Sequence, residues 1–394
     1  MTLKATTDNI AAMAASKLTG ALPALDASAL TGIVAGPTTG ASDPTVSTNP
    51  SGAGAVYENT TSGQLFICTG AAAGSNIWLN VGSGVGQVAK PFGGLGGGTI
   101  DGYIAGGYSG GTDGFQVRQD ILKISLSSDG DSTAHGNLIQ KASSEKGTGM
   151  AAGHSSATHG YSSGGDYRLP TWATSAAIDR FAFSSNVTAT DQGDLTRITN
   201  YHGGHSTITH GYTTGGAADG VPATNKMDRF PYASLSGATS IGTLAATRQV
   251  FASCDSNTHG FMCGGQRGGT NFQNVIEKFA FSSSSSSTDC GDLVNSKHGT
   301  KGSSTTTHGY VSGGGSTDTI QKFHFNTNAN ATDVGNLTAA KQGGTACSAV
   351  THTFVTGGNG PITTIQKFAH ASDGDSTNTG SLVGARQETA NSQY

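Results

Sequence analysis

Short runs in which apolar and small polar residues alternate dominate residues 100–394. One run consists of an aromatic residue, two further residues and a glycine pair. Its six copies are GYIAGG from Gly102, GYSSGG from Gly160, GYTTGG from Gly211, GFMCGG from Gly260, GYVSGG from Gly309 and TFVTGG from Thr353. They lie 58, 51, 49, 49 and 44 residues apart, and Thr-His precedes five of them. A run that recurs about every 50 residues predicts one structural unit per copy.

Two further runs follow each glycine pair. The first reads ILKISL from Ile121, IDRFAF from Ile178, VIEKFAF from Val275, TIQKFHF from Thr319 and TIQKFAH from Thr364. The second reads TDQGDL from Thr190, TDCGDL from Thr288, TDVGNL from Thr332 and TNTGSL from Thr377. Residues two apart in a strand share a face, so pairs such as Phe181 and Phe183 are predicted to fill the space between units.

Each unit therefore contains about four short strands, which cannot bury both faces of one sheet alone. Radial stacking of the sheets buries those faces and leaves few exposed edges. The first unit begins at its second strand, 101–107, and the chain ends on a first strand, 388–394. We expect these two strands to pair and to close the ring. The predicted fold is all-β: a six-bladed β-propeller over residues 91–394.

The units resemble the kelch repeat. The similarity lies in the glycine pair that ends the second strand, in the aromatic third strand, and in a basic residue that opens the next unit, here Arg248, Lys341 and Arg386. One position departs from that pattern, because the fourth strand carries leucine where kelch repeats carry tryptophan: Leu138, Leu195, Leu244, Leu293, Leu337 and Leu382. The resemblance implies a kelch-like propeller, a fold that hosts many functions.

The connections between strands divide into two kinds. The Thr-His-Gly turns are short and uniform, whereas the loops between second and third strands vary from 108–120 and 166–177 down to 315–318. Aromatic and arginine side chains dominate interface energetics. We therefore hypothesise a ligand-binding face on the long loops, although the same side chains could instead pack their own loops. The candidate residues are Tyr108, Phe115, Arg118, Tyr167, Arg168, Trp172, Arg267 and Phe272.

Residues 1–90 have a different texture, with ASKLTG from Ala15 and ASALTG from Ala27 twelve residues apart. The many Ala, Leu and Gly positions favour contact with protein over exposure to water. We expect an attachment or oligomerisation segment over 1–50 and a small β element with a linker over 51–90. Within it, TTSG at 60–63 is predicted to form a hairpin turn.

The stretch ASKLTGALPALDASALTGI resembles the linker repeats of trimeric bacteriophage tail fibres. The stretch GAVYENTTSGQLFICTG, with 76–79, resembles a small β element found ahead of a fibre's distal domain. The resemblance implies a homotrimeric virion protein of tail-fibre or receptor-binding type, made in the host cytoplasm without a signal peptide. Residues 1–60 would then bind other virion proteins, and the long loops a host-surface glycan or protein.

Charge and cysteine content argue against several classes of partner and of metal or disulfide site. The net charge of −4 without a Lys/Arg cluster gives no footprint for nucleic acid or anionic membrane. No apolar run approaches the ~20 residues of a membrane-spanning helix. The five cysteines form no CxxC motif, so we expect free thiols rather than a zinc site or a disulfide framework. A disulfide between Cys254 and Cys263 is the less favoured alternative.

Several recurring His and Asp residues could suggest metal binding or glycosidase activity, but their repetition in successive units favours a structural role. A metal–nitrogen bond of ~2.1 Å cannot gather residues from separate blades, so we expect a turn or hydrogen-bonding role for His159, His210, His259, His308 and His352. The Asp-Gly-Asp sequences at 129–131 and 373–375 match turns better than calcium loops. Acidic pairs such as Asp191 and Asp194 recur in several units, which favours scaffold over a glycosidase site.

No HExxH or P-loop motif is present, and we predict neither cofactor, metal nor enzymatic activity. The favoured function is a phage virion protein whose propeller presents variable loops to a host surface. The alternatives are a non-adhesive decoration or collar protein that packs against other virion subunits and, less favoured, a carbohydrate-active enzyme.

Overall fold

The computed structural model describes residues 37–82, 100–110, 116–140, 147–169, 171–284 and 286–393. The chain divides into two compact units, Met1–Val88 and Ala89–Tyr394. The repeats from Ala15 and Ala27, as well as Phe115 and Tyr394, lie outside the described residues, so the predictions for them stay predictions.

The smaller unit is one four-stranded sheet. Its order is β1 (Thr38–Gly40), β2 (Val56–Asn59), β3 (Gln64–Gly70) and β4 (Ile77–Gly82), with β1 parallel to β2. As predicted, residues 60–63 form the turn between β2 and β3, where Asn59 Oδ1 accepts hydrogen bonds from two backbone N–H groups. The rings of Phe66 and Trp78 lie 6.4 and 5.7 Å from that of Tyr57 and form the core of the sheet.

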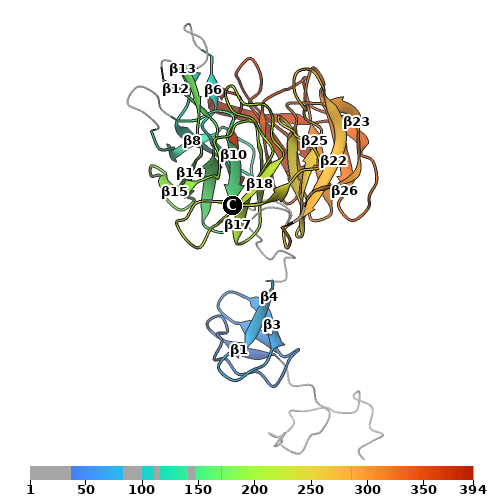
Figure 1. Cartoon of the computed structure of the whole chain (residues 1–394). Helices are drawn as coiled ribbons and strands as arrows, with labels where there is room; N and C mark the ends of the chain where they lie inside the picture. The colour runs from blue at the N-terminus through green and yellow to red at the C-terminus, as the bar shows by residue number, and fades with distance from the viewer. Residues whose placement is uncertain are drawn as a thin grey trace, which may run out of the picture. The chain divides into compact units, whose positions relative to one another are not determined.

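The described residues of the larger unit form six four-stranded antiparallel sheets (Figure 1). In strand order the sheets are β32 (Ala390–Gln393), β5 (Asp101–Ala105), β8 (Asp120–Ser125), β9 (Thr133–Asn137); β10 (Ala152–Ser155), β11 (His159–Ser163), β14 (Ala177–Ala182), β15 (Thr190–Asp194); β16 (Gly203–Ser206), β17 (His210–Thr214), β18 (Lys226–Pro231), β19 (Thr239–Thr243); β20 (Ala252–Asp255), β21 (His259–Cys263), β22 (Gln273–Ala280), β23 (Thr288–Lys297); β24 (Lys301–Ser304), β25 (His308–Ser312), β26 (Thr319–His324), β27 (Thr332–Asn336); and β28 (Thr345–Ser348), β29 (His352–Thr356), β30 (Ile362–Ala369), β31 (Thr377–Arg386). The predicted all-β repeat of four-stranded sheets is therefore confirmed.

The last strand of the chain completes the first sheet, as the sequence predicts. Strand β32 pairs antiparallel with β5, with Ala390 opposite Ala105 and Gln393 opposite Gly102. Two of the long loops form hairpins of their own, β6 (Tyr108–Ser109) with β7 (Gln116–Val117) and β12 (Asp166–Leu169) with β13 (Thr171–Thr174). Figure 1 shows β6, β12 and β13 together at one end of the larger unit.

Aromatic side chains of the second and third strands fill the space between sheets. The ring of Tyr103 on β5 lies 5.8 Å from Phe181 and 4.7 Å from Phe183, which belong to the next sheet. Phe261 makes the same contacts to Phe323 and Phe325, at 5.5 and 4.8 Å. The fourth-strand leucines are buried at all six positions: Leu138, Leu195, Leu244, Leu293, Leu337 and Leu382. Leucine thus occupies a buried position in or directly after each fourth strand.

The first strands of successive sheets are hydrogen-bonded to one another by their final residues. In each pair a backbone N–H donates to the equivalent side chain of the next sheet: Ser155 to Ser206 (3.1 Å), Ser206 to Asp255 (3.1 Å), Asp255 to Ser304 (2.9 Å), Ser304 to Ser348 (2.9 Å), Ser348 to Gln393 (2.7 Å) and Gln393 to Ser155 (3.0 Å). Each residue therefore both donates to one sheet and accepts from another.

These contacts require glycine at the second residue of at least two first strands. A Cβ added at Gly153 would lie 1.8 Å from Asn391 O, and one added at Gly302 would lie 1.9 Å from Ser253 O. Both obstacles are backbone atoms, which cannot rotate away. Glycine is therefore needed at these positions for the strands to approach.

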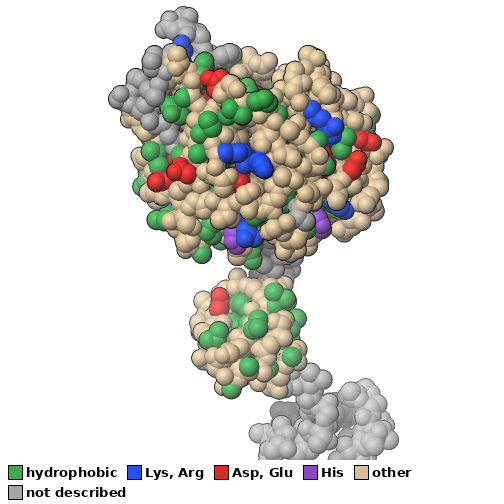
Figure 2. All heavy atoms as spheres, in the orientation of Figure 1, with side chains coloured by type: hydrophobic (Ala, Val, Ile, Leu, Met, Phe, Trp, Pro, Cys, Tyr) green, Lys and Arg blue, Asp and Glu red, His purple; other side chains and the backbone are tan. Residues whose placement is uncertain are grey.

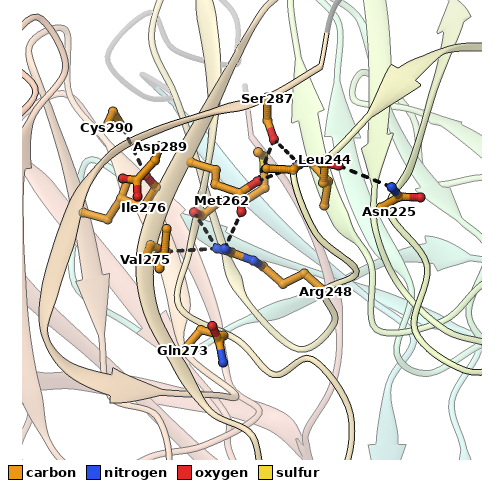
Figure 3. Close-up of polar contacts among 12 residues, drawn as sticks. Asn225, Leu244, Arg248, Met262, Gln273, Val275, Ile276, Ser287, Asp289 and Cys290 are labelled. Atoms are coloured by element: carbon orange, nitrogen blue, oxygen red, sulfur yellow. Dashed lines mark hydrogen bonds and ion pairs between the residues drawn. The ribbon is translucent and has the colours of Figure 1, made fainter.

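Buried cations form a second set of links between sheets. The guanidinium of Arg248 donates to Glu277 Oε1 at 2.6 Å and to the carbonyl oxygens of Val275 and Met262 at 2.9 and 3.3 Å (Figure 3). Arg386 pairs with Asp120 Oδ2 at 2.7 Å in the same way. Lys341 has no carboxylate partner among the described residues and donates to Thr364 Oγ1 at 2.7 Å, and burial lowers its pKa to about 8. The basic residues of the repeat thus tie one unit to the next.

Gly153→Ala should lower the free energy of unfolding by about 1–3 kcal/mol, because the added methyl overlaps backbone that cannot move aside. Gly302→Ala, at the equivalent position of another sheet, should cost a similar amount. Gly384→Ala is the control, since its Cβ would meet nothing closer than 3.8 Å. Urea unfolding measures all three variants. A Gly153→Ala protein as stable as wild type would show that β32 and β10 are not packed together.

Arg248→Met should lower the free energy of unfolding by about 3–5 kcal/mol, because Glu277 then keeps a buried charge without its counter-ion. Adding Glu277→Gln to this variant should restore part of the loss. Urea unfolding of the single and double variants checks the prediction. A double variant no more stable than Arg248→Met would mean that the lost hydrogen bonds, and not the unpaired charge, dominate.

Candidate functional site

One residue shortly before each first strand has a left-handed backbone. The φ angles are 57° at Met150, 53° at Tyr201, 57° at Val250, 65° at Gly299, 67° at Gly343 and 52° at Glu388. Backbone N–H groups donate to carbonyls within this set: Met150 to Glu388 (2.8 Å), Glu388 to Gly343 (2.6 Å), Gly343 to Gly299 (3.1 Å), Gly299 to Val250 (2.9 Å), Val250 to Tyr201 (2.9 Å) and Tyr201 to Met150 (3.0 Å). These six residues are called the left-handed set below. Each non-glycine member carries about 1–3 kcal/mol of backbone strain.

A cavity of about 660 Å³ opens beside the left-handed set. Met150, Tyr201 and Glu388 line it, whereas Val250, Gly299 and Gly343 do not. The residue just before the left-handed position adds an amide side chain in four sheets: Asn200, Gln249, Gln342 and Gln387. The cavity is therefore built from equivalent positions of the repeat whose side chains differ from one unit to another.

Two of the sequence-predicted site residues meet in this cavity. The ring of Tyr108 is buried, with 2% of its surface exposed, and lies edge-on to Trp172 at 5.4 Å. Trp172 on β13 keeps 39% of its surface exposed and lines the cavity with Tyr108. Arg168 lies outside the lining, with its guanidinium 5.8 Å from the Trp172 ring. Tyr108, Arg168 and Trp172 are thus brought together, but only two of them line the cavity.

The other predicted residues lie elsewhere on the long loops. Arg118 is paired with Asp120 at 2.9 Å, and Phe272 stacks on His298 with ring centres 4.0 Å apart. Tyr167 is half-buried and Arg267 exposed, and neither lines the cavity. Phe115 lies outside the described residues. Arg118 and Phe272 thus contact Asp120 of β8 and His298, and neither lines the cavity.

Sequence reasoning missed Asp166, Asn200, Tyr201, Asp219 and Glu388, all of which line the cavity. A signal was available for the left-handed set. In five of the six units this residue stands six positions after the fourth-strand leucine, as Tyr201 does after Leu195. The position is visible only when the repeats are aligned, because its residue type changes in almost every unit.

The cavity is acidic. Burial raises the pKa of the Asp166 carboxyl, hydrogen bonds from Asn200 at 2.9 and 2.8 Å oppose that rise, and the charge of Asp219 adds to it. Burial also raises the pKa of Tyr108 and of Tyr201, and nearby carboxylates raise both further. Both phenols therefore stay protonated and able to donate hydrogen bonds near neutral pH.

The recurring histidines are the first residues of the second strands, directly after the turns, and they make local hydrogen-bonding contacts. In each Thr-His pair the histidine Nδ1 lies 2.8 Å from the preceding threonine Oγ1: His159, His210, His259, His308 and His352. Within the described part of the chain, no group of three His, Cys, Asp or Glu side chains is placed to hold a metal ion. All five cysteines are buried and free, so the predicted free thiols are confirmed.

Comparison with known proteins assigns no family. No family model matches the chain, and no curated protein matches it either. The described ranges contain no helix with the length and apolar character needed to cross a bilayer. On the face of the larger unit in Figure 2, charged side chains are few and lie scattered over a mostly uncharged surface.

Val250→Gly should raise the free energy of unfolding by about 1 kcal/mol, because glycine adopts the left-handed conformation without strain. Val294→Gly is the matched control. Val294 lies in β23 and is half exposed, so the same substitution there should lower stability by about 1 kcal/mol through chain entropy. Chemical denaturation measures the change in the free energy of unfolding for both variants, and we expect the two changes to have opposite signs. Destabilisation by Val250→Gly would contradict the assignment of strain to this residue.

Proposed function

We propose that the larger unit is a closed, six-bladed, kelch-like β-propeller that acts as a non-catalytic recognition module. Two sets of hydrogen bonds support closure, since each runs through all six sheets and returns to its starting residue. In the first, Gln393 of the last strand donates to Ser155 of β10. In the second, Met150 donates to Glu388. The recognition site is the cavity beside the left-handed set.

The proposal rests mainly on which members of the left-handed set keep a side chain despite the backbone strain. Glycine is the relaxed choice for a left-handed backbone, and it stands at Gly299 and Gly343, which do not line the cavity. Met150, Tyr201 and Glu388 keep side chains at the same backbone angle, and all three line it. Val250 keeps a side chain at this angle without lining the cavity, so three of the four strained members line it; strained residues of this kind cluster at functional sites.

The chemistry of the lining suits a polyhydroxylated ligand, as in a host-surface glycan. Amide side chains such as Gln249 and Gln342 both donate and accept hydrogen bonds, which matches sugar hydroxyls. The exposed ring of Trp172 offers a flat apolar surface with a polar edge. The cavity volume of about 660 Å³ falls within the range of roughly 300–1,000 Å³ typical of small-ligand sites.

In this proposal the smaller unit and the residues before it attach the propeller to a bacteriophage particle as a homotrimer, with residues 1–60 bound to other virion proteins. The resemblance to fibre linkers is the main support. A second support comes from β4, where Ile77, Leu79 and Val81 alternate on one face and expose 62, 56 and 42% of their surface. An apolar row of this kind favours contact with protein, here with other copies of the chain.

Full-length protein should bind a subset of neutral or amine-bearing glycans on an array, and Trp172→Ala should weaken that binding about tenfold or more. Phe272→Ala is the matched control. Phe272 is exposed to a similar degree, 37% against 39%, but lies outside the cavity, so its removal should leave binding unchanged. Equal effects of the two substitutions, or no glycan binding by the wild type, would remove the proposal.

A further inference from the structure

The charge of the cavity lining limits which ligands it can take. Three carboxylates line it, Asp166, Asp219 and Glu388, whereas none of its described lining residues is a lysine or an arginine. Two cations contact lining residues from outside: Lys301 Nζ lies 3.7 Å from Glu388 Oε2 and partly offsets its charge, and the Arg168 guanidinium lies 5.8 Å from the Trp172 ring. In the described part of the chain neither Asp166 nor Asp219 makes an ion pair. The lining therefore attracts cations and repels anions.

A buried hydrogen-bond acceptor also favours a ligand that can donate hydrogen bonds. Asn200 is 6% exposed, and its Nδ2 donates to both carboxylate oxygens of Asp166. Asn200 lines the same cavity, and among the described residues its buried Oδ1 has no hydrogen-bond partner. A buried acceptor left without a donor costs about 1–3 kcal/mol. A ligand that places an N–H group there would recover that energy.

We infer that the ligand of this cavity carries a protonated amine, and that it is an amino sugar. This inference rests on the proposed function and names its ligand class. An ammonium group offers three donors and no acceptor, which complements a lining of carboxylates and a buried carbonyl oxygen. The rings of Tyr108, Trp172 and Tyr201 line the same cavity, and aromatic faces attract cations.

The amides of the lining favour a sugar over a lysine side chain as the source of the amine. Gln249, Gln342, Asn359 and Gln387 surround the carboxylates with paired donors and acceptors. A lysine side chain offers only a methylene stem between its backbone and its amine, whereas a sugar offers hydroxyls on every side. Uronic and sialic acids are excluded, because their carboxylates would face Asp219 and Glu388.

The test uses full-length protein and three trisaccharide probes at about pH 6, where an amine is protonated: glucosamine, N-acetylglucosamine and galacturonic acid. Calorimetry should give the tightest binding for glucosamine, about tenfold or more over its N-acetylated form, and none for galacturonic acid. The preference should shrink at high salt, since charge attraction is screened. A tri-lysine peptide tests the other source of an amine and should compete at least tenfold more weakly.

Asp219→Asn and Glu388→Gln should each reduce the preference for glucosamine over N-acetylglucosamine. Asp194→Asn is the control, because Asp194 is an exposed carboxylate that does not line the cavity. Equal binding of the two sugars, galacturonic acid as the best probe, or equal competition by tri-lysine would overturn the inference and leave the recognition module standing. Failure to bind any sugar would remove both proposals.

Discussion

The close approach of the first strands is the constraint on which the larger unit depends. Each of these strands must come near enough to the next sheet for a backbone N–H to reach a short side chain, as Asp255 N reaches Ser304 Oγ at 2.9 Å. That distance leaves no room for a Cβ at Gly153 or Gly302. The aromatic contacts of Tyr103 and the buried pair of Arg248 with Glu277 then fill the wider space away from those strands.

Within each repeat, this constraint distinguishes positions that hold the sheets together from positions whose side chains are free to vary. Some buried positions keep one residue type in every repeat, as the six fourth-strand leucines show. The left-handed position keeps only its backbone, which a hydrogen bond holds on each side, so its side chain can vary from none at Gly299 to a phenol at Tyr201 or a carboxylate at Glu388. A fixed backbone with variable side chains is the arrangement on which we base the proposed recognition site.

The same separation explains what the sequence could and could not predict. The four-stranded sheets, the aromatic contacts between them and the pairing of the last strand with β5 follow from features that recur along the chain. The cavity does not, because Asp166, Tyr201 and Glu388 differ from their counterparts and give no repeated signal. Residue type misled in one respect: Tyr108 looks like a loop aromatic in the sequence, yet its ring is buried.

Amide hydrogen exchange at the left-handed set tests the central claim of a closed ring most directly. If the ring is closed, the amides of Met150 and Glu388 exchange only with global unfolding, as slowly as those of Val250 and Gly299, because all four lie in one cycle of backbone hydrogen bonds. Fast exchange at Met150 and Glu388 beside slow exchange at Val250 and Gly299 would contradict the account, since it would place an open seam at β32, where the first sheet meets its two neighbours.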